Sequence, residues 1–291
     1  MLLTIRRVTA SSSISFEVYD FAFRIRSNVP ETRRAFKRLY GDFTKPVSDA
    51  TALDADFNAD GDGRFFWQVG DKYGSEAALI PALWAFEAAL CERMLLSQAA
   101  RVAIHGVGVY SRNSAAVIVG RSGAGKSTLS LALARRGFAV ASDDVTLVDP
   151  ATLHLLPVPR CYHLDANSVA MLEADRFRFP RTWEDFHFLV PADLGVRAVP
   201  ERTARYLILM SGPRQESPRL EPISQAEMAA QILAETGRAQ LRDSDVIGVL
   251  ARMAGAAGCY RLFPGQLGPT ADMLADLLNS EGAECGASIS A

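Results

Sequence analysis

Cysteine is scarce in this chain of 291 residues, which contains only four. They are scattered, no two of them form a Cys-x-x-Cys pair, and they stand at Cys91, Cys161, Cys259 and Cys285. Neither a disulfide framework nor a cysteine-based zinc site is therefore indicated. His154, His163 and His187 also lack metal-ligand spacing with the cysteines. We expect a reduced protein of the cytoplasm whose thiols are structural.

An excess of one charge is also missing. The 31 Lys and Arg residues and 33 Asp and Glu residues leave a net charge of −2, which argues against a dedicated nucleic-acid binder. Long uncharged apolar runs are absent too. The most apolar stretch, "AALIPALWAFEAALCERMLL", contains Pro81, Glu87, Glu92 and Arg93. It predicts a buried amphipathic helix in place of a membrane span.

The patterning predicts an α/β protein with two parts. In "SISFEVYDF" and "FAFRIRS" apolar and polar residues alternate, as in half-buried strands, and "PETRRAFKRLYGDF" predicts a helix that starts near Pro30. We expect a smaller N-terminal α+β domain over residues 1–100, which could bind an acceptor or a partner. A larger domain over residues 101–280 should carry a phosphate-binding loop. The small, polar residues 281–291 should form a mobile tail.

That loop lies in "VIVGRSGAGKST", which begins at Val117. Gly120, Gly125, Lys126 and Ser127 fit the pattern G-x-x-x-x-G-K-[ST]. The preceding "AAVIV" is a buried-strand pattern, and the following "STLSLALARRG" predicts a helix that ends at its glycine. Backbone N–H groups and a helix N-terminus in such a loop surround phosphate oxygens. The alternative is a chance glycine turn before a helix.

The pattern predicts ATP and Mg2+ as cofactors. Lys126 would reach the β and γ phosphates, and Ser127 would hold Mg2+. The other residues expected to contact the nucleotide surround these two, and they are Gly120, Ser122, Gly123, Ala124, Gly125 and Thr128.

Two acids follow the next predicted strand. "FAVAS" runs directly into "DDVTLVD", so the unit is strand, helix, strand, and its two strands should be parallel with a right-handed crossover. Both strands then end at the same edge of the sheet, and Asp143 and Asp144 emerge beside the loop. Alternation sends the two carboxylates in different directions, so one can face Mg2+ and the other an incoming hydroxyl. An ordinary acidic turn after a strand is the alternative.

A histidine precedes the loop. "IHGVGVY" and "AAVIVG" form a predicted hairpin that turns at "SRNS", and the register places His105 opposite Gly120. His105 could orient an aspartate or contact a phosphate. A structural hydrogen-bonding role is the alternative, and the geometry alone favours neither.

Residues 103–149, "IHGVGVY…VIVGRSGAGKST…LARRGFAVASDDVTLVD", resemble the HPr kinase/phosphorylase family. That family has a histidine before a glycine, then the loop, then paired aspartates. The resemblance implies an HPr-kinase-like core that transfers phosphate to a protein serine. It implies that Asp144 is the base, that His105 assists and that Lys126 binds phosphate. Ser127 would ligate Mg2+, which leaves Asp143 as the second candidate metal ligand.

Beyond residue 150 the resemblance is to a diverged branch. "LLPVPRCYHLDANSV" resembles the P-x-P-R segment of HPr-kinase-related proteins, and "LIPALWAFEAAL" also fits that branch. The arginine–glycine-rich signature of the bifunctional enzymes is missing, so phosphorylase activity is not implied. Some members act on ribosomally made precursor peptides, including lasso-peptide precursors. The implied partner is a protein or precursor peptide with an acceptor serine, and a homo-oligomer stays open.

Positive side chains should stabilise charge on the transferred group. Arg160 in "PVPR" and Arg205 in "ERTARYLILM" are the candidates, and solvated surface arginines are the alternative. A transport-type ATPase is disfavoured because no LSGGQ-like signature occurs, and a GTPase because no NKxD-like motif occurs. A small-molecule kinase and a nucleotide-binding scaffold without transfer remain alternatives.

Overall fold

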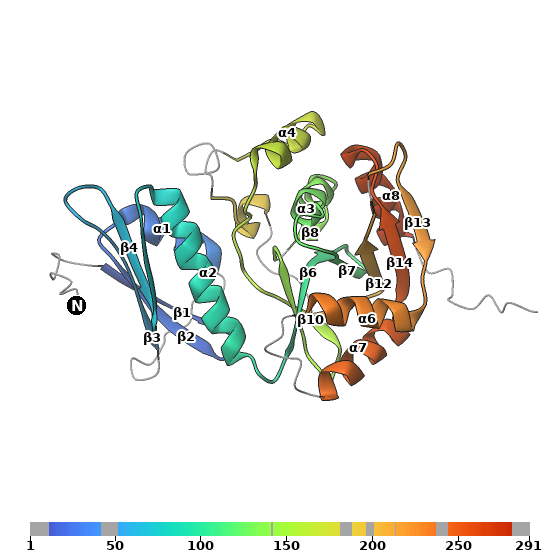
Figure 1. Cartoon of the computed structure of the whole chain (residues 1–291), viewed down its shortest axis with the longest axis horizontal. Helices are drawn as coiled ribbons and strands as arrows, with labels where there is room; N and C mark the ends of the chain where they lie inside the picture. Colours follow the sequence, from blue (N-terminus) through green and yellow to red (C-terminus); the bar gives the residue numbers. More distant parts are fainter. Residues whose placement is uncertain are drawn as a thin grey trace, which may run out of the picture.

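The computed structural model describes residues 12–41, 52–140, 142–180, 188–195, 201–212, 214–236 and 244–280. The expectations for residues 1–11 and for the tail 281–291 lie outside the described residues. The fold is mixed α/β, as predicted, and Figure 1 shows two sheets side by side along the long axis of the molecule. Within the described part of the chain, no helix is long and apolar enough to cross a membrane.

The N-terminal sheet has five strands in the order of the chain. They are β1 (Ser12–Val18), β2 (Phe21–Ser27), β3 (Leu53–Ala59), β4 (Phe65–Val69) and β5 (Lys72–Glu76). Neighbours are antiparallel except β2 and β3, which are parallel and are separated in sequence by α1 (Pro30–Tyr40). Pro30 stands at the start of α1, as predicted, where its missing N–H costs nothing.

One face of this sheet is covered by α1 and by α2 (Leu79–Ser97). The rings of Phe36 on α1 and Phe86 on α2 meet edge to face at 5.3 Å, and Phe86 also contacts Phe57 of β3. This core continues into the larger unit, because Leu147 and Phe188 belong to the same buried cluster. The domain boundary near residue 100 therefore stays a prediction, while the packing across it is continuous.

The larger sheet has nine strands in the order β11-β10-β9-β6-β7-β12-β14-β13, with β8 paired to β6. Their bounds are β6 (Val102–Tyr110), β7 (Ala115–Val119), β8 (Ala139–Val140), β9 (Val145–Val148), β10 (His154–Pro157), β11 (Arg202–Thr203), β12 (Tyr206–Met210), β13 (Arg219–Pro222) and β14 (Gly258–Phe263). The central strands β7, β12 and β14 are mutually parallel. The first two are buried along their whole length, which explains their uninterrupted apolar sequences.

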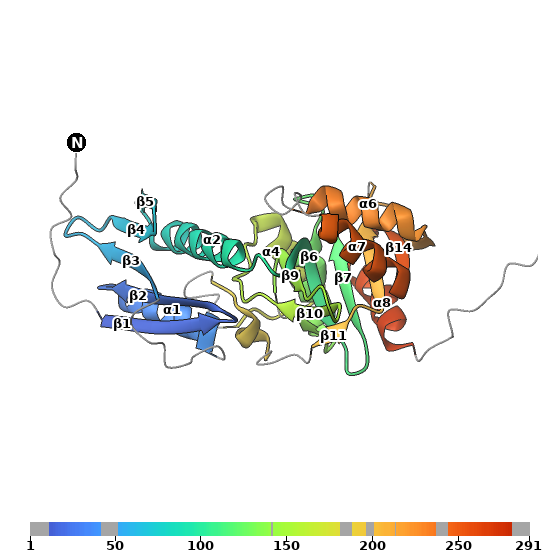
Figure 2. The ribbon, with the colours of Figure 1, turned by 90° about the horizontal axis from the view of Figure 1, so that it is seen from below.

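Helices cover both faces of the larger sheet, as Figure 1 shows. One group lies above it in that view and consists of α3 (Lys126–Arg135), α4 (Ala166–Ala174) and α8 (Leu267–Asn279). The other lies below it and consists of α6 (Gln225–Glu235) and α7 (Ser244–Ala256). A short 3-10 helix spans Pro191–Leu194. Figures 1 and 2 both show α2 running from the N-terminal sheet toward the larger one.

The hairpin register is confirmed. β6 and β7 are antiparallel, and the residue numbers of each pair sum to 225, as in Gly106 with Val119. His105 is therefore level with the first residue of the loop. β6 is also antiparallel to β8, so β7 and β8 run in the same direction, as predicted, with β6 between them. The chain does not leave the sheet after β8: it continues along β6 as β9, where Val145 pairs with His105, so Asp143 and Asp144 lie at the break between β8 and β9, level with the end of β7.

Candidate active site

The glycine-rich loop, residues 120–125, leaves the end of β7 and enters α3. Gly120 has φ +152° and passes so close to β12 that a Cβ atom would lie 2.7 Å from the carbonyl oxygen of Met210. Gly125, at the helix entry, has φ +94°. Such backbone conformations favour glycine, because a Cβ atom would clash or be strained there. The motif glycines are thus explained by the path of the chain.

Lys126 lies across this loop. Its Nζ donates to the carbonyl oxygens of Gly120 at 2.7 Å and Arg121 at 3.2 Å. Burial lowers the pKa of Lys126, while the nearby carboxylates of Asp144 and Glu235 act in the opposite direction. The Lys126 ammonium is thus held by two neutral carbonyl oxygens. Phosphate oxygens of a bound nucleotide can replace these carbonyls as its hydrogen-bond acceptors.

The remaining loop residues differ in their surroundings. Ser122 and Gly123 are exposed at its tip, and Ala124 closes a turn by donating its N–H to the Arg121 carbonyl at 3.1 Å. Thr128 does not face the loop with a free hydroxyl, because its Oγ1 donates to Ser168 of α4 at 3.0 Å. Its predicted nucleotide contact would have to displace that hydrogen bond.

Asp143 is almost fully enclosed, with 2% of its surface exposed. Its Oδ1 has no hydrogen-bond partner. Burial, and after it the charge of Asp144, raise the pKa of Asp143 to about 7, whereas a hydrogen bond from Ser127 lowers it. A buried oxygen without a partner next to a serine hydroxyl suits a hard divalent cation, and both atoms are oxygen ligands.

Asp144 has different partners from Asp143, and a turn, not the strand alternation assumed from the sequence, sets its direction. It occupies a tight turn with φ +64°, where the Val145 N–H donates to the Asp143 carbonyl at 2.8 Å. Its Oδ1 lies 3.7 Å from Nε2 of His105, and its Oδ2 lies 3.8 Å from Nη1 of Arg160. His105 lowers the pKa of Asp144, and Arg160 acts in the same direction against the effect of burial. The carboxylate is therefore ionised at neutral pH and can accept a proton.

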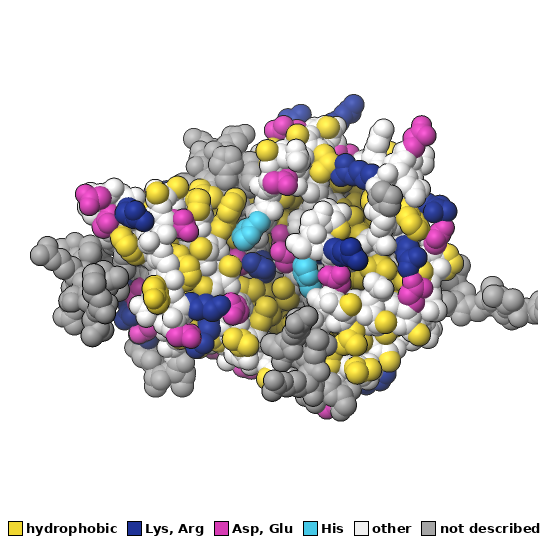
Figure 3. Space-filling model, viewed as in Figure 1, with side chains coloured by type: hydrophobic (Ala, Val, Ile, Leu, Met, Phe, Trp, Pro, Cys, Tyr) yellow, Lys and Arg dark blue, Asp and Glu magenta, His cyan; other side chains and the backbone are white. Residues whose placement is uncertain are grey.

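Two acids of this site were not predicted from the sequence. Glu235, at the end of α6, places Oε2 3.8 Å from Nδ1 of His105, so the ring lies between two carboxylates. Glu87, on α2, is fully buried and pairs with Arg160. No local signal marked either residue, because Glu235 ends an ordinary amphipathic helix and Glu87 stands within an apolar one. Figure 3 shows histidine, acidic and basic side chains gathered in the middle of the face of the molecule that is seen in Figure 1.

Cys161 and His163 also meet here, although sequence spacing did not predict it. The Cys161 Sγ lies 3.2 Å from the His163 Nε2, which is 4.0 Å from Oε2 of Glu87. One ligand atom from each of the three residues lies within 4.8 Å of the others, a span that could hold a metal ion. Both carboxylate oxygens of Glu87 accept hydrogen bonds from Arg160 in this arrangement.

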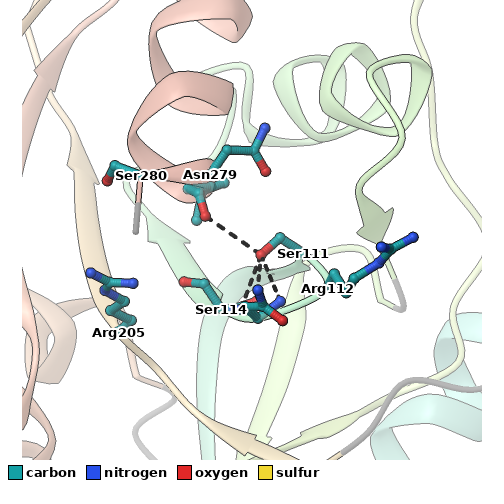
Figure 4. Close-up of a pocket in the computed structure, with 8 residues that line it drawn as sticks. Ser111, Arg112, Ser114, Arg205, Asn279 and Ser280 are labelled. Atoms are coloured by element: carbon teal, nitrogen blue, oxygen red, sulfur yellow. Dashed lines mark hydrogen bonds between the residues drawn. The ribbon is translucent and has the colours of Figure 1, made fainter. Parts of the chain in front are cut away.

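The prediction for Arg205 does not hold. Arg205 precedes β12, which is parallel to β7, so it lies at the opposite end of β7 from the loop; its N–H donates to the Ala115 carbonyl at 2.8 Å. Its guanidinium lies over the ring of Tyr206, and it lines a separate pocket of about 220 Å³ with residues of the β6–β7 turn and the end of α8 (Figure 4). A phosphate on the loop is out of its reach.

No protein-family model and no curated protein match this chain. Among solved structures, the HPr(Ser) kinase/phosphatase from Coxiella burnetii is similar to it, with 18% sequence identity over 60% of this chain and 87% of that chain. The TM-score of that comparison is 0.30. A likeness this low carries no residue-by-residue correspondence, so each site residue is assigned from its own geometry.

Proposed function

We propose that this protein is a kinase that transfers the γ-phosphoryl group of ATP to a serine hydroxyl of a protein or a precursor peptide. One observation carries the proposal: Lys126 of the loop, the buried unpartnered oxygen of Asp143 and the ionised Asp144 lie close together, since Ser127 hydrogen-bonds Asp143 and the charge of Asp144 acts on Lys126. These are the parts that phosphoryl transfer requires.

The loop and the start of α3 would bind the nucleotide. Backbone N–H groups of residues 121–126 and the positive end of the helix attract phosphate oxygens. The Lys126 ammonium exchanges its two carbonyl partners for phosphate oxygens. Ser127 and Asp143 would hold Mg2+, which supplies charge neutralisation on the phosphates when it is bound.

Asp144 would act on the acceptor. It takes the proton of the serine hydroxyl while the oxygen forms its bond to the γ-phosphorus and the bond to the ADP oxygen breaks. The products are a phosphoserine and ADP, and the proton on Asp144 passes to solvent. His105 holds the carboxylate from one side, and Arg160 offers positive charge to the transferred group from the other.

The acceptor class comes from the sequence resemblance to HPr-kinase-related proteins. It is tested by incubating the purified chain with γ-labelled ATP, Mg2+ and serine-containing precursor peptides, each paired with a peptide in which alanine replaces the serine. We expect label on the serine peptides only, and none with Lys126→Ala. Label on a small hydroxyl compound and on no peptide would instead identify a small-molecule kinase. Nucleotide binding without transfer to any acceptor would identify a scaffold.

A further inference from the structure

Helix α2 of the N-terminal unit sends a carboxylate into the candidate active site. Glu87 has none of its surface exposed. Its Oε1 accepts from Arg160 Nε at 3.2 Å, and its Oε2 accepts from Arg160 Nη2 at 3.1 Å. This is a two-pronged pairing between residues 73 positions apart in the sequence.

Burying a carboxylate at this position costs free energy that packing alone does not return. Leu83, Phe86 and Leu90 are buried on the same helix, and an apolar residue in place of Glu87 would continue that core. Removing a charge from water costs several kcal/mol unless its partner has good geometry. The Glu87–Arg160 pair therefore needs an explanation beyond packing.

The pairing orients the guanidinium of Arg160. Because Glu87 occupies Nε and Nη2 along one edge, the planar group cannot rotate, and Nη1 is left at the other edge. That Nη1 lies 3.8 Å from Oδ2 of Asp144. The remaining nitrogen thus faces the carboxylate that would receive the acceptor proton.

We propose that Glu87 is a positioning residue that holds Arg160 against the γ-phosphate of the bound nucleotide, so that the N-terminal unit completes the active site. The inference rests on the proposed nucleotide site. Continuous packing supports it, since Phe86 contacts the N-terminal sheet while Cys161 and Phe188 lie in the same core. A ligand that shifts α2 would therefore shift Arg160.

The test compares the affinities of Mg2+-ATP and Mg2+-ADP by calorimetry on the full chain. Wild type, Glu87→Gln, Arg160→Gln and the double variant are measured. Glu92→Gln is the matched control, because Glu92 lies on the same helix but is exposed and pairs with Lys72. We expect wild type and control to prefer ATP over ADP. In each single variant the ratio of ATP affinity to ADP affinity should fall about tenfold, which corresponds to the loss of one charged hydrogen bond, while the ADP affinity stays unchanged.

The double variant isolates the link between the two residues. If Glu87 acts through Arg160, it loses no more ATP preference than Arg160→Gln alone. If Glu87→Gln fails to fold, Glu87→Asp takes its place, because it keeps the charge that pairs with Arg160 but shortens the side chain, and it should lose part of the ATP preference. Once an acceptor is known, Glu87→Gln should lower kcat and leave the KM for the acceptor unchanged, and Glu87→Asp should recover part of kcat.

Specific results would overturn the inference. One such result is an unchanged ATP preference in folded Glu87→Gln. Another is zinc bound stoichiometrically to the wild-type protein and lost in both Glu87→Gln and Cys161→Ser, because Glu87 would then be a metal ligand. An ATP preference that depends on Glu87, without phosphoryl transfer to any acceptor, would sink the proposed function and leave this inference standing. A wild-type protein that binds no nucleotide would overturn both.

Discussion

Nε2 of His105 lies 3.7 Å from Oδ1 of Asp144, and the pairing of β6 with β9, in which His105 is opposite Val145, brings the two residues together. The distance is longer than that of a full hydrogen bond. Nδ1 of the same ring lies 3.8 Å from Glu235. The ring therefore joins an acid that follows β8 to an acid at the end of α6. In active sites such distances commonly shorten when the substrate binds.

Asp144→Asn should leave ATP affinity near that of the wild type and lower phosphoryl transfer by about 10²- to 10⁴-fold, since an amide cannot take the acceptor proton. Nucleotide titration and phosphopeptide formation measure the two effects separately. Asp149→Asn is the control, because Asp149 is exposed and bonds only within its own turn. Transfer at the wild-type rate in Asp144→Asn would remove this residue as the base.

His105→Gln should move the acid limb of the pH–rate profile to higher pH. His105 is the main influence that lowers the pKa of Asp144, so without it the carboxylate binds its proton more tightly and needs a higher pH to ionise. The rate is measured from pH 4 to 9 at saturating ATP. An acid limb that stays in place would show that the ring does not act on Asp144.

Asp143→Asn should remove stabilisation by Mg2+. The unpartnered oxygen of Asp143 beside Ser127 is expected to gain an ion on binding, and a neutral amide is a weaker ligand. Thermal melting with ADP, with and without Mg2+, is the measurement. We expect Mg2+ to raise Tm by several degrees in the wild type and by little in the variant. An equal rise in both proteins would place the ion elsewhere.

Gly120→Ala should destabilise the fold by about 2 kcal/mol or more, because the new Cβ atom would lie 2.7 Å from a backbone oxygen of β12. Gly123→Ala is the matched control: it also has a positive φ, +76°, but nothing lies within 4 Å of its Cβ position. It should cost only the left-handed strain, about 1 kcal/mol. Urea unfolding compares them, and equal losses would show that β12 does not constrain the loop.

Asp175→Asn should weaken the attachment of α3 to α4 in a pH-dependent way. Burial alone raises the pKa of Asp175, but hydrogen bonds from Arg136 and Arg135 outweigh it and lower the pKa. A lowered carboxyl pKa contributes stability above the unfolded value near pH 4, and this is lost as pH falls through the folded pKa. The wild type should exceed the variant by about 1–3 kcal/mol at pH 7 and by little near pH 3. A constant difference would exclude this charge effect.

Local signals in the sequence were sufficient for several parts of this protein. The turn "SRNS" and its flanking strands determine the β6–β7 register, because a short turn leaves little choice of pairing. Pro30 starts α1, and Gly137 follows α3 with φ +88°. The loop glycines and the paired aspartates act within one strand–helix–strand unit, where neighbours in sequence are neighbours in space.

Only the tertiary structure decided the rest. Glu87 reaches Arg160 because the core of the N-terminal unit continues into the larger one, and Glu235 reaches His105 because α6 ends at the same sheet edge. Arg205 failed as a phosphate contact because the direction of β12 places it at the far end. Sequence patterns report burial and local turns, whereas a contact between distant segments depends on strand order and packing. In the sequence, a charged residue within a helical pattern gives the same signal whether its side chain faces water or pairs with a buried arginine.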